Sequence, residues 1–265
     1  MKKIKFLQYL VVALFIFGLN SCAILGGNGT QSPQNSERMA RATGAAVTAL
    51  SISDEQIQLL SKQSVIQLDA KSRIAPANSK YTTRLNKLTK NLKSVNGLPL
   101  NYKVYLTDEI NAFACADGSI RVYSGLMDVM SDSELVGILG HEIGHIANKD
   151  TKDAMRTSYL SYAALQALGT TGDIMAALTS SQIGSIAQQF ISAKYSRKQE
   201  YEADDYGFNV TVNQGLDKYA MAKALEKLVS LSKGEEASAL AQMFSSHPNS
   251  KERAKRIRTK ADKLK

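Results

Sequence analysis

Two histidines and a glutamate stand at a spacing that suits metal chemistry, in the segment His141-Glu142-Ile143-Gly144-His145. Residues four apart on a helix lie one turn apart on the same face, so both imidazoles can reach a single ion. Glu142 is rotated away from the histidines but can reach a water on that ion, and zinc lowers the pKa of such a water. A carboxylate can take its proton as it attacks a peptide carbonyl. The segment therefore predicts zinc-dependent peptide hydrolysis.

A helix has to present these residues, and the preceding sequence predicts one. Ser131 and Glu134 stand at the spacing of a capping box, with the serine as N-cap. Apolar residues then recur at helical spacing into the histidine segment, so we expect a helix that ends near Asn148. The alternative is a helix with two incidental histidines, which is a rare accident in a chain with three histidines.

A catalytic zinc needs a third protein ligand and an open position for water. The third histidine, His247, comes about a hundred residues later. Glu200 and Asp204 are four apart on another predicted helix and share a face, so Glu200 could ligate zinc while Asp204 accepts a hydrogen bond from a ligand histidine. Glu202 and Asp205 point elsewhere. The alternative for this cluster is a solvated acidic helix surface.

Further motifs give these residues a context. An arginine-containing segment, Ser196-Arg-x-x-Glu-x-x-Ala-Asp204, is followed by His247-Pro248 and by Arg253, six residues past the histidine. With the histidine segment, this pattern resembles the HtpX-like and CAAX-protease-like zinc metallopeptidases, above all their periplasmic lipoprotein members. The resemblance covers nearly the whole mature chain and includes Ala75-Pro-Ala-Asn-Ser, Asn101-Tyr-Lys-Val-Tyr, Asn111-Ala-Phe-Ala, Ile120-Arg-Val-Tyr-Ser-Gly-Leu-Met-Asp and Ala203-Asp-Asp-Tyr.

The resemblance implies a set of zinc ligands. Glu200 would be the third ligand beside His141 and His145, with one Zn²⁺ per chain. Asp204 would support the ligands or the transition state. Position 115 is a cysteine in this chain, and a cysteine pairing found in a relative need not exist here.

The same resemblance gives roles to His247 and Arg253. His247 would face the zinc, where it could stabilise an oxyanion or bind the open position and hold the enzyme latent. Arg253 would support this segment or the substrate carbonyl. Without the resemblance, His247 is a surface loop residue and Arg253 a surface charge on the tail helix.

The resemblance also suggests how a substrate would be held. A strand beside the metal, Asn111-Ala112-Phe113-Ala114, could align a peptide by main-chain hydrogen bonds, as in β-augmentation. Without the resemblance, Phe113 is a core residue.

The N-terminus predicts export. Lysines precede an apolar run, Phe6 to Leu19, which is too short for a comfortable membrane span and fits a secretory signal peptide over 1–21. Leu19-Asn20-Ser21-Cys22 resembles a bacterial lipobox, so we expect cleavage before Cys22 and lipid on its thiol. Asn20 departs from the small or apolar residue usual there. The alternative is an uncleaved anchor.

The expected boundaries follow from this N-terminus. Residues 22–50 would form the lipidated N-terminus and a flexible tether, rich in Gly, Asn, Gln and Ser, and 51–265 the metallopeptidase domain. Ala23, after the lipidated cysteine, agrees with sorting to the outer membrane. We expect a lipid-anchored protein of the bacterial envelope, at the outer membrane and facing the periplasm.

The net charge of +9 gives little support to a nucleic-acid partner. The surplus lies at the two ends, because residues 251–265 hold eight basic and two acidic side chains and the signal segment adds three lysines. No aromatic residues interleave with the basic run. We expect no nucleic acid as partner and interpret the tail as a solvated helix face, with contact to anionic headgroups as the alternative. Cys115 is expected to be buried and inert.

Periodicity places the remaining elements. We expect helices over about 53–71, 80–95, 189–213, 216–232 and from Ser250 to the end, helices within 154–193 with a break near Gly169–Gly172, and a small antiparallel sheet from 102–106, 111–116 and 119–123. Asp117-Gly118 is a hairpin signal. The fold class is thus α+β, predominantly helical, with a zincin-like metallopeptidase domain.

The expected function is hydrolysis of peptide bonds in unfolded or misassembled envelope proteins, as quality control. Two alternatives remain. One is a chaperone or assembly factor for outer-membrane proteins with weak or latent protease activity. The other is a structural lipoprotein with a stabilising zinc bound by four ligands, His247 among them.

Overall fold

The computed structural model describes residues 52–166, 178–248 and 250–264, without the side chains of 164–166. The predicted signal peptide (1–21), the tether with Cys22 (22–50) and the predicted helix break near 169–172 lie outside the described residues. Among the helices that are described, none is both long enough and apolar enough to cross a membrane.

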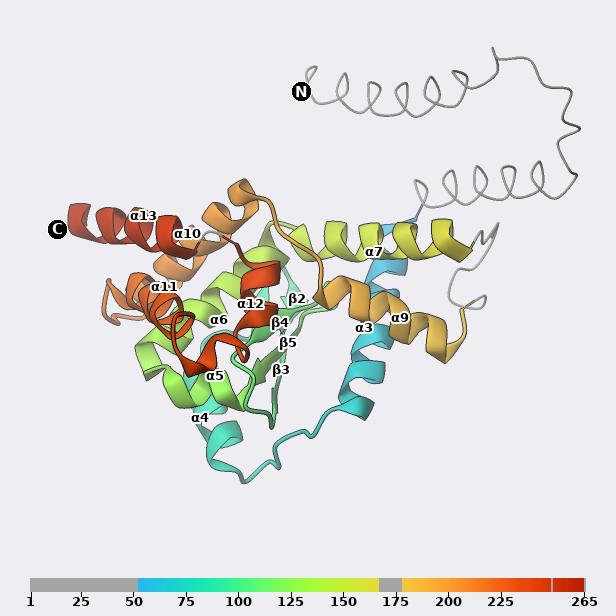
Figure 1. Ribbon diagram of the computed structural model, residues 1–265, viewed down its shortest axis with the longest axis horizontal. Helices are drawn as coiled ribbons and strands as arrows, with labels where there is room; N and C mark the ends of the chain where they lie inside the picture. Colours follow the sequence, from blue (N-terminus) through green and yellow to red (C-terminus); the bar gives the residue numbers. More distant parts are fainter. Residues whose placement is uncertain (1–51, 167–177, 249, 265) are drawn as a thin grey trace, which may run out of the picture. The chain divides into compact units, whose positions relative to one another are not determined.

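Helices make up most of the domain, as the α+β prediction requires (Figure 1). They are α3 (Asp54–Lys71), α4 (Lys80–Leu88), α5 (Ser124–Val129), α6 (Asp132–Ala147), α7 (Asp150–Gln166), α9 (Ser180–Ile191), α10 (Arg197–Asn213), α11 (Ala220–Leu231), α12 (Ala241–Ser246) and α13 (Ser250–Lys263), with a 3₁₀ turn η1 (Glu235–Ala237). The strands are β1 (Ser94–Val95), β2 (Leu98–Pro99), β3 (Asn101–Tyr105), β4 (Ala112–Ala114) and β5 (Ser119–Tyr123).

The main sheet has three strands in the order β3-β5-β4. The predicted hairpin is confirmed: β4 and β5 pair antiparallel around Asp117 and Gly118, and Gly118 has a φ of 87° that a side chain would strain. Strand β3 joins β5 in parallel, so this sheet is mixed rather than antiparallel throughout. β4 is left at an edge.

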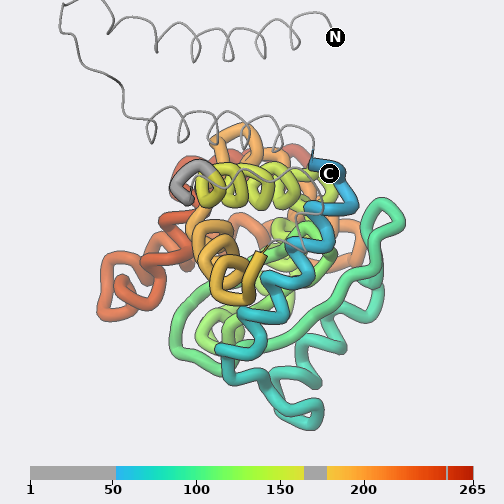
Figure 2. Tube along the Cα trace, turned by 90° about the vertical axis from the view of Figure 1, so that its right-hand side faces the viewer, coloured from blue at the N-terminus to red at the C-terminus, as the bar shows by residue number. Residues whose placement is uncertain are grey.

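The two faces of this sheet pack into different cores. Ile120 and Val122 face the larger core, which α5, α6, α11 and α13 complete. Tyr105 and Phe113 point the other way, into a second core shared with α3, α7 and α9. This alternation is what a strand dictates when both of its faces are covered. Figure 2 shows α3 and α9 running side by side in that second layer.

A buried ion pair between Arg121 and Asp69 links α3 to the sheet. Arg121 of β5 is 1% exposed, and its Nε lies 2.8 Å from Asp69 Oδ1 on α3. Lys103 and Tyr105 of β3 also donate to the Asp69 carboxylate, at 2.7 and 2.6 Å. The charge on Arg121 is therefore paired and hydrogen-bonded where it is buried, as a buried charge must be.

Three predicted helix boundaries need correction. The helix expected over 80–95 ends at Leu88, and Ser94–Val95 instead form β1, which pairs with β2 across the positive-φ turn at Asn96 and Gly97. The helix expected over 189–213 is two helices, because Ser196 and Gln199 form a capping box that starts α10 at Arg197. The helix expected over 216–232 begins only at Ala220.

The predicted helices over 53–71 and from Ser250 are confirmed as α3 and α13. Cys115 is fully buried and free, and burial raises the pKa of its thiol well above the usual value. That environment fits the inert thiol that the sequence predicts.

Candidate metal centre

Helix α6 presents the histidine segment as predicted. Its N-terminus carries the expected capping box, in which the Ser131 hydroxyl accepts from Glu134 N and the Glu134 carboxylate accepts from Ser131 N. The last two turns hold His141, Glu142 and His145, all at most 3% exposed. The imidazoles therefore lie on one face of α6, in the interior of the domain.

A close helix crossing brings the second motif to the first. α10 packs along α6, and the residues at the crossing are small: a Cβ added to Gly144 would lie 2.9 Å from Ala203 Cα, and one added to Gly140 would lie 2.8 Å from Gly207 Cα. Real Cβ atoms hardly ever come so near a neighbour. The near-absence of side chains at the crossing lets Glu200, on α10, reach the histidines of α6.

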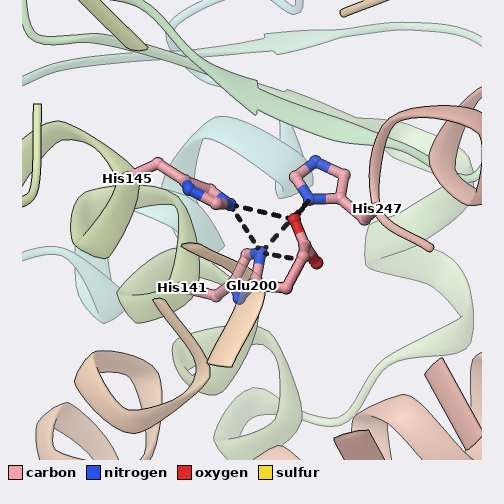
Figure 3. Close-up of side chains that lie close together, drawn as sticks. All are labelled: His141, His145, Glu200 and His247. Atoms are coloured by element: carbon pink, nitrogen blue, oxygen red, sulfur yellow. Dashed lines mark hydrogen bonds and ion pairs between the residues drawn. The ribbon is translucent and has the colours of Figure 1, made fainter. Parts of the chain in front are cut away.

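Four ligand atoms converge there (Figure 3). His145 Nε2 lies 3.1 Å from His141 Nε2 and 3.4 Å from Glu200 Oε1. His247 Nδ1 lies 3.3 Å from His141 Nε2 and 3.0 Å from Glu200 Oε1. His247 directly follows α12 and is 5% exposed, so the structure places it at the centre and not on the surface.

The outer ring nitrogens of the two α6 histidines are already engaged. His141 Nδ1 donates to Asp204 Oδ1 at 3.0 Å, and His145 Nδ1 donates to Asp150 Oδ2 at 2.9 Å. Each Nε2 therefore turns a lone pair inward. Two lone pairs 3.1 Å apart repel each other unless a cation, a proton or a metal ion, lies between them.

The distances suit a metal ion in that place. An ion with four tetrahedral bonds of about 2.1 Å to nitrogen and oxygen has ligand atoms about 3.4 Å apart. Four of the separations between the ligand atoms, 3.0 to 3.4 Å, are close to that value, and all of the ligand atoms lie within 4.8 Å of one another. Histidine nitrogens with a carboxylate oxygen are also the donor set that such ions favour in proteins. The four side chains could therefore hold one metal ion.

The electrostatics of the two histidines differ. Burial lowers the pKa of His141 to about 4. Burial acts on His145 in the same direction, but hydrogen bonds to Asp150 and Glu200 outweigh it and raise the pKa of His145 to about 9. Of the two imidazoles, His145 is thus the stronger base.

Arg253 neutralises the carboxylates of α10. It is 2% exposed, forms an ion pair with Glu200, and donates to Asp204 from Nε at 2.8 Å and from Nη2 at 2.6 Å. Burial would raise the pKa of Asp204, but Arg253 and His141 lower it to about 2. Burial would also raise the pKa of Glu200, but His247 and Arg253 hold it far below its usual range. Arg253 is therefore a buried partner of the centre, and not a surface charge.

Glu142 lies beside the centre without joining the ligand cluster. Its Oε1 is 3.8 Å from His247 Nε2, and burial raises the pKa of its carboxyl group. Together with the predicted substrate strand, Glu142 and His247 line one small cavity, to which the α9–α10 linker contributes Ala193 and Tyr195. A carboxyl group in this position could exchange a proton with a molecule bound at the metal.

The predicted substrate strand lies at that cavity. Asn111 and β4 line it, and β4 is an edge strand. In an antiparallel pair, every second residue turns its N–H and C=O groups toward the partner strand. In β4, the N–H and C=O groups of Ala112 and Ala114 point away from β5. The Phe113 ring instead packs against Tyr105 and Tyr123 in the second core.

Three residues of the centre escaped prediction. Tyr195 stacks on His145 with ring centroids 3.9 Å apart. Asp150 receives the His145 hydrogen bond, and Gln199 donates to Asp150 at 3.0 Å. An acidic residue just past the predicted end of the motif helix was the available signal for Asp150. Nothing in the sequence places Tyr195 in contact with His145.

Comparison with known proteins agrees with this geometry. Residues 79–261 match the model of peptidase family M48. The chain is 40% identical to Metalloprotease LoiP of Escherichia coli (strain K12), over 91% of the chain and 90% of that protein. It is 42% identical to Metalloprotease YcaL of the same organism, over 80% of the chain and 83% of that protein. It is also 31% identical to the Beta-barrel assembly-enhancing protease of Yersinia pestis, over 72% of the chain and 40% of that protein.

The sequence resemblance is thereby confirmed. Residues 79–261 contain all four clustered side chains, Glu142 and the strand β4, so the part that matches the family is the part that builds the centre. Peptidases of this family depend on a metal ion, and the buried His/Glu cluster could hold one. The chain belongs to peptidase family M48 and is a metalloendopeptidase.

Proposed function

We propose that the protein is a zinc-dependent endopeptidase in which His141, His145 and Glu200 hold the ion and Glu142 is the general base. The observation that carries this proposal is the convergence of two inward lone pairs and one carboxylate on a single point, with a second carboxylate beside it. Zinc, when bound, lowers the pKa of water and polarises a scissile carbonyl.

The protein's own residues would perform the other steps. Glu142 takes a proton from the attacking water and passes it to the leaving amine, a transfer for which a raised carboxyl pKa is suited. Asp204 and Arg253 act through the ligands: Asp204 orients His141, and Arg253 balances the charge of Asp204 and Glu200. The substrate backbone would pair with the outer edge of β4, where the Asn111 Oδ1 that accepts from Ala112 N at 2.9 Å would have to be displaced.

His247 is proposed to hold this site latent. Its Nδ1 lies within the ligand cluster itself, 3.0 Å from Glu200 Oε1, where a water would otherwise find an open position. The cavity between β4 and the α9–α10 linker is about 10 Å³, which is too small for a peptide. Activity would then require the segment that carries His247 to move away.

The substrates are proposed to be unfolded or misassembled proteins of the bacterial envelope. Two features support this: the lipobox-like segment that ends at Cys22, and the name of a relative, a protease that enhances β-barrel assembly. The protein would be anchored by lipid on Cys22, at the outer membrane and facing the periplasm. Incorporation of labelled palmitate by the wild type but not by Cys22→Ser tests the anchor.

A digestion experiment tests the activity. Wild-type protein is incubated with an unfolded outer-membrane protein and with the same protein folded, before and after removal of metal by a chelator, and the zinc content is measured. We expect cleavage of the unfolded form only, loss with the chelator, and recovery with zinc. Zinc-independent cleavage would refute the mechanism.

An assembly factor with a latent protease is the second candidate, because the cavity beside the centre, at about 10 Å³, is too small for a peptide. It predicts that the protein suppresses aggregation of unfolded outer-membrane proteins at concentrations where it cleaves none of them. Cleavage of such proteins at a rate that accounts for their disappearance would exclude it.

A further inference from the structure

Asp150 connects a metal-site histidine to the start of helix α10. Its side chain is buried, with the residue 4% exposed. Asp150 Oδ2 accepts from His145 Nδ1 at 2.9 Å, and Oδ1 accepts from Gln199 Nε2 at 3.0 Å. Gln199 Oε1 in turn accepts from Ser196 N at 2.9 Å, as part of the α10 capping box. Both carboxylate oxygens of Asp150 thus accept hydrogen bonds from residues of the metal centre.

The backbone is bent to place Asp150 there. Only Asn148 and Lys149 separate α6 from α7, and Lys149 has a φ of 67°. A residue with a side chain is strained at positive φ, and such strain persists only where the surrounding structure imposes it. The turn places the first residue of α7 within hydrogen-bonding distance of His145 Nδ1.

The two α6 histidines differ in how their carboxylate partners are compensated. Asp204, the partner of His141, is neutralised by two hydrogen bonds from Arg253. Within the described ranges, Asp150 makes no ion pair with a lysine or an arginine, and its second partner is the neutral amide of Gln199. The charge of Asp150 is therefore left to act on His145, which makes His145 Nε2 the stronger electron donor toward a cation.

We propose that Asp150 is a positioning residue for metal binding, which fixes the tautomer and orientation of His145, and that Gln199 couples it to α10. Gln199 immediately precedes Glu200, so one capping box anchors the partner of His145 and the helix turn that carries the carboxylate ligand. The proposal rests on the proposed metal site and extends it to Asp150 and Gln199.

Metal affinity in the isolated protein tests the proposal. Dissociation constants for Zn²⁺ are measured by chelator competition in wild type, Asp150→Ala, Asp150→Asn and Gln199→Ala, with folding checked by circular dichroism. Loss of such a partner weakens metal binding by about 10–100-fold. We expect that loss for Asp150→Ala, and smaller losses for Asp150→Asn, which keeps an acceptor for His145, and for Gln199→Ala, which keeps the carboxylate.

The matched control is Asp153→Asn, which removes a carboxylate one turn further along α7 whose side chain is 67% exposed. It should bind Zn²⁺ as the wild type does. The visible spectrum of Co²⁺-loaded protein gives a second readout, because a reoriented His145 changes the ligand field. We expect a changed spectrum for Asp150→Ala and an unchanged one for Asp153→Asn.

Several outcomes would overturn the proposal. Folded Asp150→Ala with wild-type affinity and spectrum would do so, as would an equal loss in Asp153→Asn, since the effect would then be one of general charge. If Asp150→Ala does not fold, Gln199→Ala decides, and wild-type affinity in that variant contradicts the proposal. A wild type that binds no Zn²⁺ refutes the proposed metal site, whereas equal binding by all variants refutes only this inference.

Discussion

Gly144 of α6 lies against Ala203 of α10 so closely that a Cβ on Gly144 would lie 2.9 Å from Ala203 Cα. The contact has a counterpart at Gly207, where a Cβ would lie 2.6 Å from Gly137 O. The chain can assemble its centre from two distant motifs because a glycine stands on at least one side of each of these contacts. The distance between the helices is thus set by glycine, and the distance between the ligands follows from it.

Adding a methyl group at this crossing should weaken metal binding. In Gly207→Ala the new Cβ meets backbone on α6 that cannot rotate away, so α10 must shift and carry Glu200 with it. We expect the free energy of unfolding to fall by about 1–3 kcal/mol, as for an overpacked core, and the Zn²⁺ dissociation constant to rise. Denaturant unfolding and chelator competition measure the two effects.

Gly184→Ala is the control for that prediction. Gly184 lies within α9, and its Cβ would meet only the end of the Lys71 side chain, at 3.4 Å. Replacing a helix-interior glycine without a clash should raise stability by about 0.5–1 kcal/mol and leave metal binding alone. Equal behaviour of the two variants would show that the crossing does not position Glu200.

Much of this arrangement could be predicted from the sequence. The capping box at Ser131, the histidine spacing and the Asp117-Gly118 hairpin are local signals, and each of them predicted its element. The parallel pairing of β3 with β5 has no local signal, because it depends on how distant segments meet. The start of α10 had a signal, the Ser196–Gln199 capping box, which the apolar periodicity around it obscured.

The site was predictable to the same extent. The motif residues came from spacing and from the resemblance, and the structure brings His141, His145, Glu200 and His247 together. Asp150 and Tyr195 were missed because their roles depend on tertiary contacts, a strained turn at Lys149 and a ring stacked on His145. Neither contact produces a periodic pattern in the sequence.

Truncation of Arg253 should be costly for the metal-free protein. Arg253→Ala leaves the buried carboxylates of Glu200 and Asp204 without their cation. Removing one partner from a buried ion pair costs about 3–5 kcal/mol in free energy of unfolding. Urea unfolding in the presence of a chelator measures this cost without a contribution from bound metal.

Arg256→Ala is the matched control, because Arg256 lies on the same helix and pairs with Asp205 in a half-exposed setting. A pair that exposed contributes at most about 1 kcal/mol. If the two substitutions lowered the free energy of unfolding equally, the buried ion pairs of Arg253 would contribute no more to stability than an exposed pair.

Acid should weaken the contact between α3 and the sheet. Burial would raise the pKa of Asp69, but hydrogen bonds from Arg121, Lys103 and Tyr105 outweigh it and lower the pKa below its usual value of 3.8. The folded state therefore gains stability from the ionised carboxylate above that value, and loses it as the pH falls through the folded pKa. The advantage of wild type over Asp69→Asn in free energy of unfolding should be constant above about pH 5 and shrink below about pH 4.

Asp128→Asn serves as the comparison, since the Asp128 side chain is 54% exposed and pairs with Lys80, whose side chain is 76% exposed. Its effect on stability should be small at every pH tested. An Asp69→Asn deficit that stays constant into strong acid would show that the carboxylate gains nothing from being charged.

Removal of His247 should activate the protein. If its Nδ1 fills the open position of the metal, His247→Ala frees that position, and cleavage of an unfolded protein should rise several-fold with one zinc still bound per chain. Initial cleavage rates and zinc content are measured together. Loss of cleavage with zinc retained would instead assign His247 to transition-state stabilisation, and loss of zinc would make it a structural ligand.

Glu142 is the proposed general base, and a single substitution tests this role separately from metal binding. Glu142 lies next to the ligand cluster without belonging to it, so Glu142→Gln should keep the fold and the metal. The decisive measurement is the rate of cleavage of an unfolded outer-membrane protein by Glu142→Gln, with bound zinc quantified in the same sample. Exposed Glu202→Gln is the control. We expect a rate reduced by at least about 10²-fold with one zinc per chain, and wild-type behaviour for the control. Cleavage by Glu142→Gln at the wild-type rate would contradict it.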